Sequence, residues 1–365
     1  MKIECVKEKI VSSVILAEKV TGKNLTLPIL SCIHLKASGS ELTIKATNLD
    51  LGIEIVIPVK VIEEGSVVVS GSVLVGLLQN LQDDKVTLES VEGNLVFSTK
   101  TTTTSLKTLP DEDFPLIPKV DSNKTVSLEA NLLVTGLKSV WYSAAVTSMK
   151  PELSSVYIYC EEESIVFAAT DSFRLAEKRV PVKKGKDFGS VLIPFKNIPE
   201  IIRTLEMIKG EVTVHFDANQ IAFEHNGLYL VSRVIDGTFP DYKQIVPKEF
   251  KTEVIILKQD LLSALKLSNI FSDNFNQVSM RVIPEEKLFE ITTKNTMIGE
   301  NKNNLDAVLK GEDIVISFNY KYIIDCFQSI HSDSLTLSFQ GLSRPVMIRG
   351  ISDKSFMYIV MPMNK

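Results

Sequence analysis

The residues able to bind metal are few and widely separated. His34 and His331 stand alone, whereas His215 and His225 flank the predicted turn Asp217-Ala218-Asn219 and could approach each other across a hairpin. No carboxylate or cysteine stands beside that pair at the spacing of a ligand set, so a metal site is the weaker interpretation of it. We therefore expect no metal ion.

Asp171 and Arg174, in the segment ATDSFRL, could provide an acid and a clamp for an anion. The alternative is a turn aspartate and an arginine on the end of a strand. Asp111-Glu112-Asp113 could bind a cation, but it also fits a solvated connector. Walker, GxGxxG, HExxH and GxSxG sequences are absent. The sequence therefore predicts no catalytic residue and no cofactor.

The composition is that of a folded protein with more than one domain. The 365 residues are 44% hydrophobic and 23% charged, with a net charge of −5. Residues 65–82 lack the sustained apolarity of a membrane span, and the first ten residues carry charges where a signal peptide is apolar. Cys5, Cys32, Cys160 and Cys326 form no CxxC pair. We expect reduced thiols and a cytoplasmic location.

The chain is a triplication. Thr47, Thr170 and Thr293 occupy similar segments and are separated by 123 residues each time. A second, unrelated marker agrees, because Val69, Ile193 and Ile316 are separated by 124 and 123 residues. Connectors containing Phe114-Pro115 and Phe239-Pro240 lie 125 residues apart. These spacings predict domains at 1–119, 120–246 and 247–365.

Each repeat has the same predicted order of elements. A helix comes first, followed by an alternating hairpin, a strand, a second helix and two closing strands. The predicted helices are 7–20, 72–82, 129–144, 196–209, 257–271 and 319–331; hairpins include 31–37 with 41–46, 155–160 with 164–169, and 211–216 with 220–225. These helices carry ten basic and seven acidic residues, so the rest of the chain is the more acidic part. That excess matters only if the helices share one surface facing a polyanion.

Several segments closely resemble the bacterial sliding clamps, the beta subunits of DNA polymerase III. They are TLPILS at 26–31, ATNLDLGIE at 46–54, ATDSFRLA at 169–176, VIDGTFPDYKQIVP at 234–247, FNYKYIIDCF at 318–327 and the final YIVMPMNK. The resemblance runs in register along the whole chain. It implies an α+β fold of three tandem DNA-clamp domains, each with two helices packed on antiparallel sheets. It also implies a head-to-tail dimeric ring around duplex DNA, acting as a processivity factor and not as an enzyme.

The resemblance further implies a peptide-binding groove between the second and third domains. DNA polymerase III alpha subunit, the clamp loader and other replication and repair proteins would dock there through short peptides. The implied residues are Leu153, Thr170, Arg174, Leu175, Pro240, Ile245, Phe275, Asn319, Tyr322, Val346, Val360, Met361, Pro362 and Met363. Apolar and Met side chains suit an adaptable groove, although the terminal methionines could instead belong to the core of the last strand.

The chain departs from the family pattern at the edge of this groove. Ser172-Phe173 replaces the usual Gly-His, and Gln244 stands where a basic residue is common. The family also places an arginine that touches DNA at the position of Asn24, where the neighbouring Lys23 could substitute. The expected DNA-facing residues are Lys9, Lys23, Asn24, Lys138, Lys150, Lys196, Arg203, Lys266 and Lys321. The expected dimer contacts are Thr104, Leu106, Ile270 and Phe271.

Two other classes of function compete with a clamp. An enzyme could hold a small substrate near Asp171 and Arg174, but the sequence offers no base, nucleophile or phosphate loop for it. A structural repeat protein without a nucleic-acid role is the other alternative. Retention on circular but not on linearised DNA would distinguish a ring from both.

Overall fold

The computed structural model describes residues 1–22, 27–120, 125–147, 149–182 and 189–363. Lys23 and Asn24, two of the expected DNA contacts, lie outside these residues. The chain divides into two compact units, one of residues 1–133 with 196–234 and the other of residues 134–195 with 235–365.

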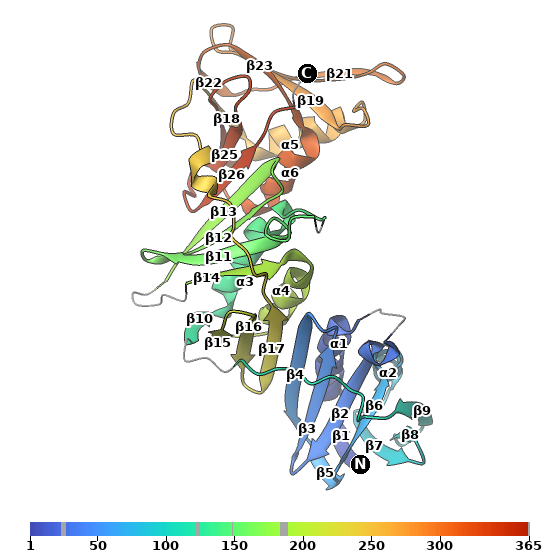
Figure 1. The fold of residues 1–365 in the computed structure, drawn as a ribbon. Coiled ribbons are helices and arrows are strands. Elements are labelled where there is room, and N and C mark those ends of the chain that lie inside the picture. The colour runs from blue at the N-terminus through green and yellow to red at the C-terminus, as the bar shows by residue number, and fades with distance from the viewer. Residues whose placement is uncertain (23–26, 121–124, 148, 183–188, 364–365) are drawn as a thin grey trace. The chain divides into compact units, whose positions relative to one another are not determined.

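The three repeats have similar element orders, since each starts with a strand and a helix and has a second helix before its last three strands, one closing strand more than predicted (Figure 1). The first contains β1 (Lys2–Val6), α1 (Lys7–Val20), η1 (Pro28–Ser31), β2 (Cys32–Ser38), β3 (Glu41–Thr47), β4 (Leu51–Pro58), β5 (Lys60–Glu63), β6 (Gly65–Ser70), α2 (Gly71–Asn80), β7 (Lys85–Val91), β8 (Asn94–Ser98) and β9 (Thr103–Leu109). The second contains β10 (Thr125–Glu129), α3 (Ala130–Val140), η2 (Trp141–Ser143), β11 (Ser155–Glu161), β12 (Ser164–Thr170), β13 (Arg174–Pro181), β14 (Ser190–Pro194), η3 (Phe195–Asn197), α4 (Ile198–Glu206), β15 (Glu211–Phe216), β16 (Gln220–His225) and β17 (Leu228–Arg233). After η4 (Tyr242–Ile245), the third contains β18 (Thr252–Leu257), α5 (Lys258–Asn269), β19 (Gln277–Ile283), β20 (Leu288–Asn295), β21 (Gly299–Asn304), β22 (Val308–Gly311), β23 (Ile314–Asn319), α6 (Tyr320–Asp325), η5 (Cys326–Ser329), β24 (Ser334–Phe339), β25 (Val346–Gly350) and β26 (Phe356–Val360).

Strand pairing continues across the borders between repeats. In the first unit, the antiparallel sheet has the order β10-β15-β16-β17-β4-β3-β2-β6-β9-β8-β7-β1-β5, so β17 of the second repeat pairs with β4 of the first. In the second unit, the larger sheet has the order β14-β11-β12-β13-β26-β25-β24-β18-β22, so β13 of the second repeat pairs with β26 of the third. This unit also contains a four-stranded sheet of order β21-β20-β19-β23. Each compact unit therefore contains one such junction.

The first helix of each repeat begins in the same way. The backbone N–H groups of Lys7, Ala130 and Lys258 donate to the carbonyls of Asp84, Gly210 and Asp333, at 2.8, 3.0 and 2.8 Å. The observed helices agree with the predicted ones, although the second helix of each repeat is shorter than predicted. The 3-10 turns η2 and η5 directly follow α3 and α6. In the first repeat, α1 packs against α2, β3 and β4, and in the third, α5 packs against β20 and β21.

The strand pairing corrects the position of the repeated threonine in the third repeat. Leu192 pairs with Tyr157 and Tyr157 with Ala168, while Val315 pairs with Arg281 and Arg281 with Glu290. Counting along β12 and β20 from Ala168 and Glu290 brings Thr292, not Thr293, to the position of Thr170. The threonine of the third repeat that corresponds to Thr170 is therefore Thr292, and not Thr293 as the spacing predicted.

Each connector between repeats packs an aromatic ring on a central strand. The ring of Phe114 lies 5.2 Å from that of His34, and the ring of Phe239 lies 4.8 Å from that of Tyr157, centroid to centroid. Ile117 in the first connector packs on Ala222, Tyr229 and Val231. The repeat therefore extends to the connectors, as their spacing predicted.

The hairpin does not bring His215 and His225 opposite each other, although the sequence allowed it. Phe216 pairs with Ile221, so His215 lies opposite Ala222 and its Nε2 is 2.9 Å from the carboxylate of Glu224. His225 instead contacts the backbone carbonyl of Glu211 through Nδ1, at 2.8 Å. The described residues contain no cluster of possible metal ligands. All four cysteines are free thiols, as expected, and no described helix is long and apolar enough to cross a membrane.

Candidate functional site

The loop between β12 and β13 holds a fixed shape through its own side chains. Asp171 Oδ1 accepts the backbone N–H groups of Phe173 and Arg174, both at 2.9 Å. The Thr170 hydroxyl donates to the carbonyl of Arg174 at 2.6 Å and accepts from the N–H of Ser172. Ser172 has a φ of +76°, a conformation that glycine adopts more easily. Serine at this position therefore stores strain in the turn.

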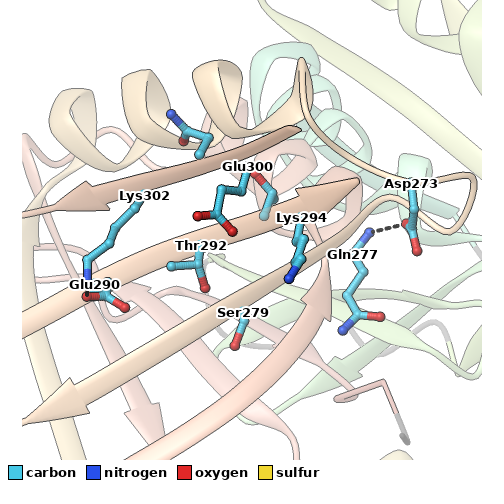
Figure 2. Close-up of a pocket in the computed structure, with 10 residues that line it drawn as sticks. Asp273, Gln277, Ser279, Glu290, Thr292, Lys294, Glu300 and Lys302 are labelled. Atoms are coloured by element: carbon cyan, nitrogen blue, oxygen red, sulfur yellow. Dashed lines mark hydrogen bonds and ion pairs between the residues drawn. The ribbon is translucent and has the colours of Figure 1, made fainter. Parts of the chain in front are cut away.

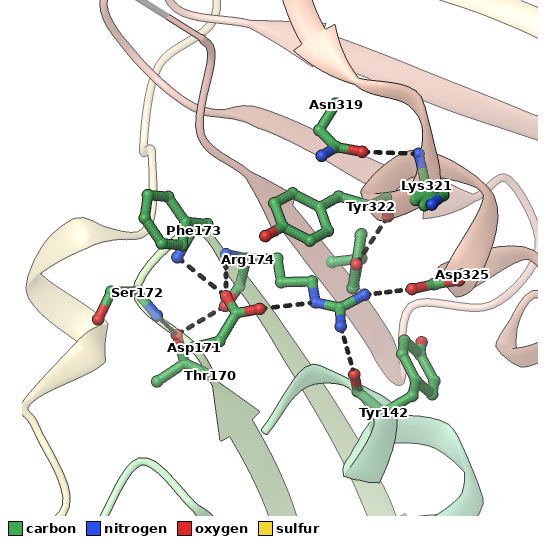
Figure 3. Close-up of polar contacts among 11 residues, drawn as sticks. Tyr142, Thr170, Asp171, Ser172, Phe173, Arg174, Asn319, Lys321, Tyr322 and Asp325 are labelled. Carbon is green, nitrogen blue, oxygen red and sulfur yellow. Dashed lines mark hydrogen bonds and ion pairs between the residues drawn. The ribbon is translucent and has the colours of Figure 1, made fainter. Parts of the chain in front are cut away.

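Arg174 is the centre of a buried polar network (Figure 3). Its Nε donates to Asp171 Oδ2 at 3.0 Å, one terminal nitrogen donates to Asp325, and the other donates to the carbonyl of Tyr142 at 2.6 Å. The guanidinium also lies 4.7 Å from the ring centroid of Tyr322. Only 11% of the Arg174 side chain is exposed, so this cation is not solvated.

These contacts also bear on the possibility of catalysis. Burial alone would lower the pKa of Arg174, but Tyr358, Asp171 and Asp325 outweigh that effect and leave the pKa raised. Burial raises the pKa of Tyr142 and of Tyr358 well above the ordinary value. The acid and the cation that could have served a small substrate therefore bind each other and hold the loop in place.

Aromatic side chains form the exposed wall beside this network. Phe173, the residue that departs from the family pattern, is 59% exposed and stacks on Tyr322 at 6.4 Å between centroids. Phe275 is 69% exposed, and its carbonyl accepts from the Asn319 side chain at 3.4 Å. Asn319 also caps α6 by accepting the N–H of Lys321 at 3.0 Å. The wall is apolar and exposed, and the Asn319 side chain holds the backbone at Phe275 and Lys321.

The C-terminal tail runs along this wall. The N–H of Met361 donates to the carbonyl of Phe173, and that of Met363 to the carbonyl of Ser317, both at 2.8 Å. Met361 is 37% exposed, whereas Val360 before it is fully buried in β26. The two methionines follow the last strand, so they are not its core. The tail joins the β12–β13 loop to β23.

A second part of the candidate groove surrounds the end of the connector. A cavity of about 410 Å³ is lined by Ile245 and Met361 together with Gln340, Ser343, Arg344 and Pro345. Ile245 ends η4 and is 54% exposed. Pro240 begins this turn by accepting the N–H of Tyr242 at 2.7 Å. Gln244 bonds to Asp241 at 2.8 Å and also lines the cavity.

A polar network holds the connector at this position. Tyr242 is buried and donates its hydroxyl to Glu177, a carboxylate that also pairs with Arg179. Tyr159 and Tyr242 share a hydrogen bond of 2.9 Å between their hydroxyls. Burial, followed by the charge of Glu177, raises the pKa of Tyr242, so this hydroxyl stays protonated. Because the turn that carries Ile245 starts at Tyr242, this network fixes the position of Ile245.

The remaining residues of the expected groove are buried beneath it or beside it. Arg174 pairs with Val360, and Val360 pairs with Val346, so these three stand in one row across β13, β26 and β25. Thr170 and Leu175 form the next pair along β12 and β13. Leu153 is buried in the loop before β11, where its carbonyl accepts the N–H of Ala145. These positions are covered, whereas Phe173, Ile245, Phe275 and Met361 are the exposed apolar side chains of the expected set.

The expected DNA-facing cations differ in their contacts. All of the described ones are exposed: Lys9, Lys138, Lys150, Lys196, Arg203, Lys266 and Lys321. Lys196 pairs with Asp50, and Arg203 pairs with Glu200 at 2.6 Å. Two other helix lysines are used structurally, because Lys7 and Lys258 donate to the carbonyls of Leu81 and Ile330. Several cationic side chains of the helices therefore already bind a carboxylate or a backbone carbonyl of this chain.

The third repeat contains a polar cavity that sequence reasoning did not predict (Figure 2). It measures about 430 Å³, and its lining includes Glu290, Thr292, Glu300 and Lys302 on β20 and β21. The Lys302 ammonium lies 2.5 Å from the buried carboxylate of Glu290. By strand register, Glu290 stands where the second repeat has Ala168, which packs beneath the connector. The equivalent face of the third repeat is polar.

Sequence reasoning missed several residues of the site. Asp325 pairs with Arg174 across 151 residues of sequence, and no local pattern marks that partnership. Glu177 and Arg179 resemble ordinary charged strand residues. Arg344 and Pro345 lie in the turn between β24 and β25, and no pattern in the sequence assigned them to the site.

Comparison with known proteins adds a consistent result. Models of the DNA polymerase III beta subunit match the chain with the N-terminal domain at residues 1–118, the central domain at 127–241 and the C-terminal domain at 243–364. The beta sliding clamps of Staphylococcus epidermidis and Staphylococcus aureus are each 24% identical over 357 residues, covering 94% of both chains.

Solved structures match at full length. The DNA polymerase III beta subunit of Thermotoga maritima has a TM-score of 0.94 at 26% identity, over 100% of this chain and 99% of that one. The sliding clamp of Bacillus subtilis has a TM-score of 0.95 at 24% identity, with the same coverage.

Proposed function

We propose, from the premise that this chain belongs to the DNA polymerase III beta subunit family and is a DNA sliding clamp, that two copies close head to tail into a ring. The three domains, with borders at 119/120 and 246/247, then contribute six units to it. Such a ring would be a cytoplasmic, non-catalytic processivity factor. Its link to DNA would be topological, and the weak charge excess of the helices suits that arrangement.

The observation that best supports a ring is that two of the described strands, one in the first repeat and one in the third, each have an unpaired edge. Junctions inside the chain join β17 to β4 and β13 to β26. The next junction in the series would join the strands equivalent to these, which are β9 of one copy and β21 of the other. Among the described strands, β21 pairs only with β20, and Thr103–Lys107 of β9 pair only with β8. Unpaired edges of this kind are templates for pairing with another chain.

The expected dimer residues fit this seam to different degrees. Phe271 lies beside the start of β21, since a side chain built at Gly299 would come within 3.7 Å of its ring. Ile270 is 62% exposed. Thr104 lies on the available part of β9, but Leu106 is already buried within its own repeat. We therefore propose Ile270, Phe271 and Thr104 as contacts, with Leu106 supporting β9 from beneath.

The groove around the tail is the proposed docking site for peptides of the polymerase III alpha subunit, the clamp loader and repair proteins. Its accessible side chains are apolar, and two backbone hydrogen bonds hold the tail in an extended path. Deletion of residues 361–365 removes Met361 and Met363 but leaves β26 intact. Calorimetric titration with a clamp-binding peptide from a DNA polymerase should then show loss of binding, without a change in sedimentation.

Ring function is tested separately from the groove. After assembly on circular DNA by a clamp loader, the protein should elute with the DNA, and cutting the circle should release it. Release from uncut circles at the same rate would contradict a topological link. An undiminished peptide affinity after tail deletion would contradict only the groove assignment.

A further inference from the structure

The loop between β3 and β4 reproduces the loop that carries Arg174. Asn48 Oδ1 accepts the N–H groups of Asp50 and Leu51 at 3.0 and 2.8 Å, as Asp171 does for Phe173 and Arg174. The Thr47 hydroxyl donates to the carbonyl of Leu51 at 3.0 Å, as that of Thr170 does to Arg174. Leu49 has the same φ of +76° as Ser172. The first junction therefore contains a second copy of the groove-forming turn.

The adjoining strand is reproduced as well. Leu51 pairs with Ser232 as Arg174 pairs with Val360, which makes Arg233 the counterpart of Met361. The N–H of Arg233 donates to the carbonyl of Asp50 at 2.8 Å, matching the 2.8 Å bond from Met361 to Phe173. A cavity of about 330 Å³ lies at this place, within the first compact unit.

The lining of this cavity differs in chemistry from the groove around the tail. Leu51 replaces the arginine of the second junction, and Arg233 replaces the methionine. Leu49 is 48% exposed and Leu116 is 95% exposed, and both line the cavity with Pro118. Leucine at positive φ is strained, and the two exposed leucines give this cavity an apolar edge.

The cavity also has one uncommitted charge. Asp50 is neutralised by Lys196. Arg233 is exposed, and among the described residues no carboxylate pairs with its guanidinium. A ligand with leucine-like side chains next to a carboxylate would complement both features.

We propose that this cavity is a second peptide-docking site, which takes a short extended segment of a partner protein with an acidic residue between two apolar ones. The inference extends the proposed function, since it treats the first junction as a modified copy of the peptide groove. The apolar side chains contact Leu49, Leu116 and Pro118, and the acidic side chain pairs with Arg233.

The test uses the full-length protein with methyl-labelled leucines and isoleucines, titrated with the capped tetrapeptide Leu-Asp-Leu-Gly and with its Leu-Asn-Leu-Gly analogue. We expect saturable shifts of the Leu49 and Leu116 methyl signals. Arg233→Gln should weaken the acidic peptide about threefold, as removal of an exposed ion pair does, and leave the analogue unchanged. Arg203→Gln, on α4, is the matched control and should change neither.

Leu49→Gly gives an independent check. Glycine accepts the positive φ, so the variant should fold at least as well as the parent protein. It should bind both peptides roughly fivefold more weakly, because it lacks one apolar contact. Unshifted Leu49 and Leu116 methyls at millimolar tetrapeptide would overturn the proposal, as would equal binding by Leu49→Gly. Shifts caused only by duplex DNA would assign the cavity to DNA instead. A parallel titration with the polymerase peptide, read at Ile245 and Leu175, tests the tail groove separately.

Discussion

Arg174→Ala should destabilise the second compact unit by about 3 kcal/mol. The guanidinium makes three charge-assisted or carbonyl contacts, to Asp171, Asp325 and Tyr142, and is almost fully buried. Removing one partner of a buried pair costs roughly 3–5 kcal/mol. The lower end applies here, because 41% of the Asp325 side chain is exposed and water can solvate its charge. The wall formed by Phe173 and Tyr322 should loosen together with the loop.

The assay is thermal unfolding followed by circular dichroism, with Arg203→Ala as the matched control. Arg203 is 46% exposed and bonds only to its helix neighbour Glu200 among the described contacts, so its loss should cost about 0.5 kcal/mol or less. We expect the Arg174 variant to lose roughly 5 °C or more relative to this control. Adding Asp325→Asn should recover part of the loss, since it removes a carboxylate left without its cation. Equal midpoints for the two alanine variants would refute the burial argument.

Three further predictions concern pH, assembly and DNA. Burial, then Lys45, lowers the pKa of His34 below 6.5; folding therefore favours its neutral form, and the stability that this gives above pH 6.5 is lost as the pH falls through the folded pKa. His34→Phe should flatten that loss, measured by urea unfolding at pH 7.5 and 5.5, and an unchanged slope would contradict it. Replacing Ile270 with Ala and Phe271 with Asp should shift sedimentation to the monomer, and a persistent dimer would place the seam elsewhere. Neutralising Lys9 and Lys266 should shorten the lifetime on DNA equally for all sequences, with a shallower salt dependence; a sequence-dependent effect would indicate base readout.

Patterns repeated along the chain predicted most of the fold. The three copies were recognisable because similar segments recur at a constant spacing, and their first helices were recognisable from the helical period of their apolar residues. The second helices were overestimated because the apolar pattern continues through Cys326–Ser329, where the backbone tightens into a 3-10 turn. A hydrophobic pattern does not distinguish these two kinds of helix.

Contacts between distant residues could not be predicted from spacing. The hairpin at Asp217 closes with Phe216 opposite Ile221, and that register, invisible in the residue types, separates His215 from His225. The burial of Arg174 depends on Asp325 and Tyr142, which arrive from other elements. The residues of the expected groove were named from a family resemblance, whereas the hydrogen bonds and ion pairs that hold them could be found only in the structure.

Because β17 pairs with β4 and β13 pairs with β26, the compact units that fold together do not coincide with the three repeats. A fragment cut at the repeat borders, such as residues 120–246, would keep its own helices but lose the partner strand on each side. Both newly bared edges would be long and flanked by buried apolar residues, which favours aggregation over autonomous folding. Cooperative unfolding should therefore follow the two compact units, and each transition should melt part of the middle repeat.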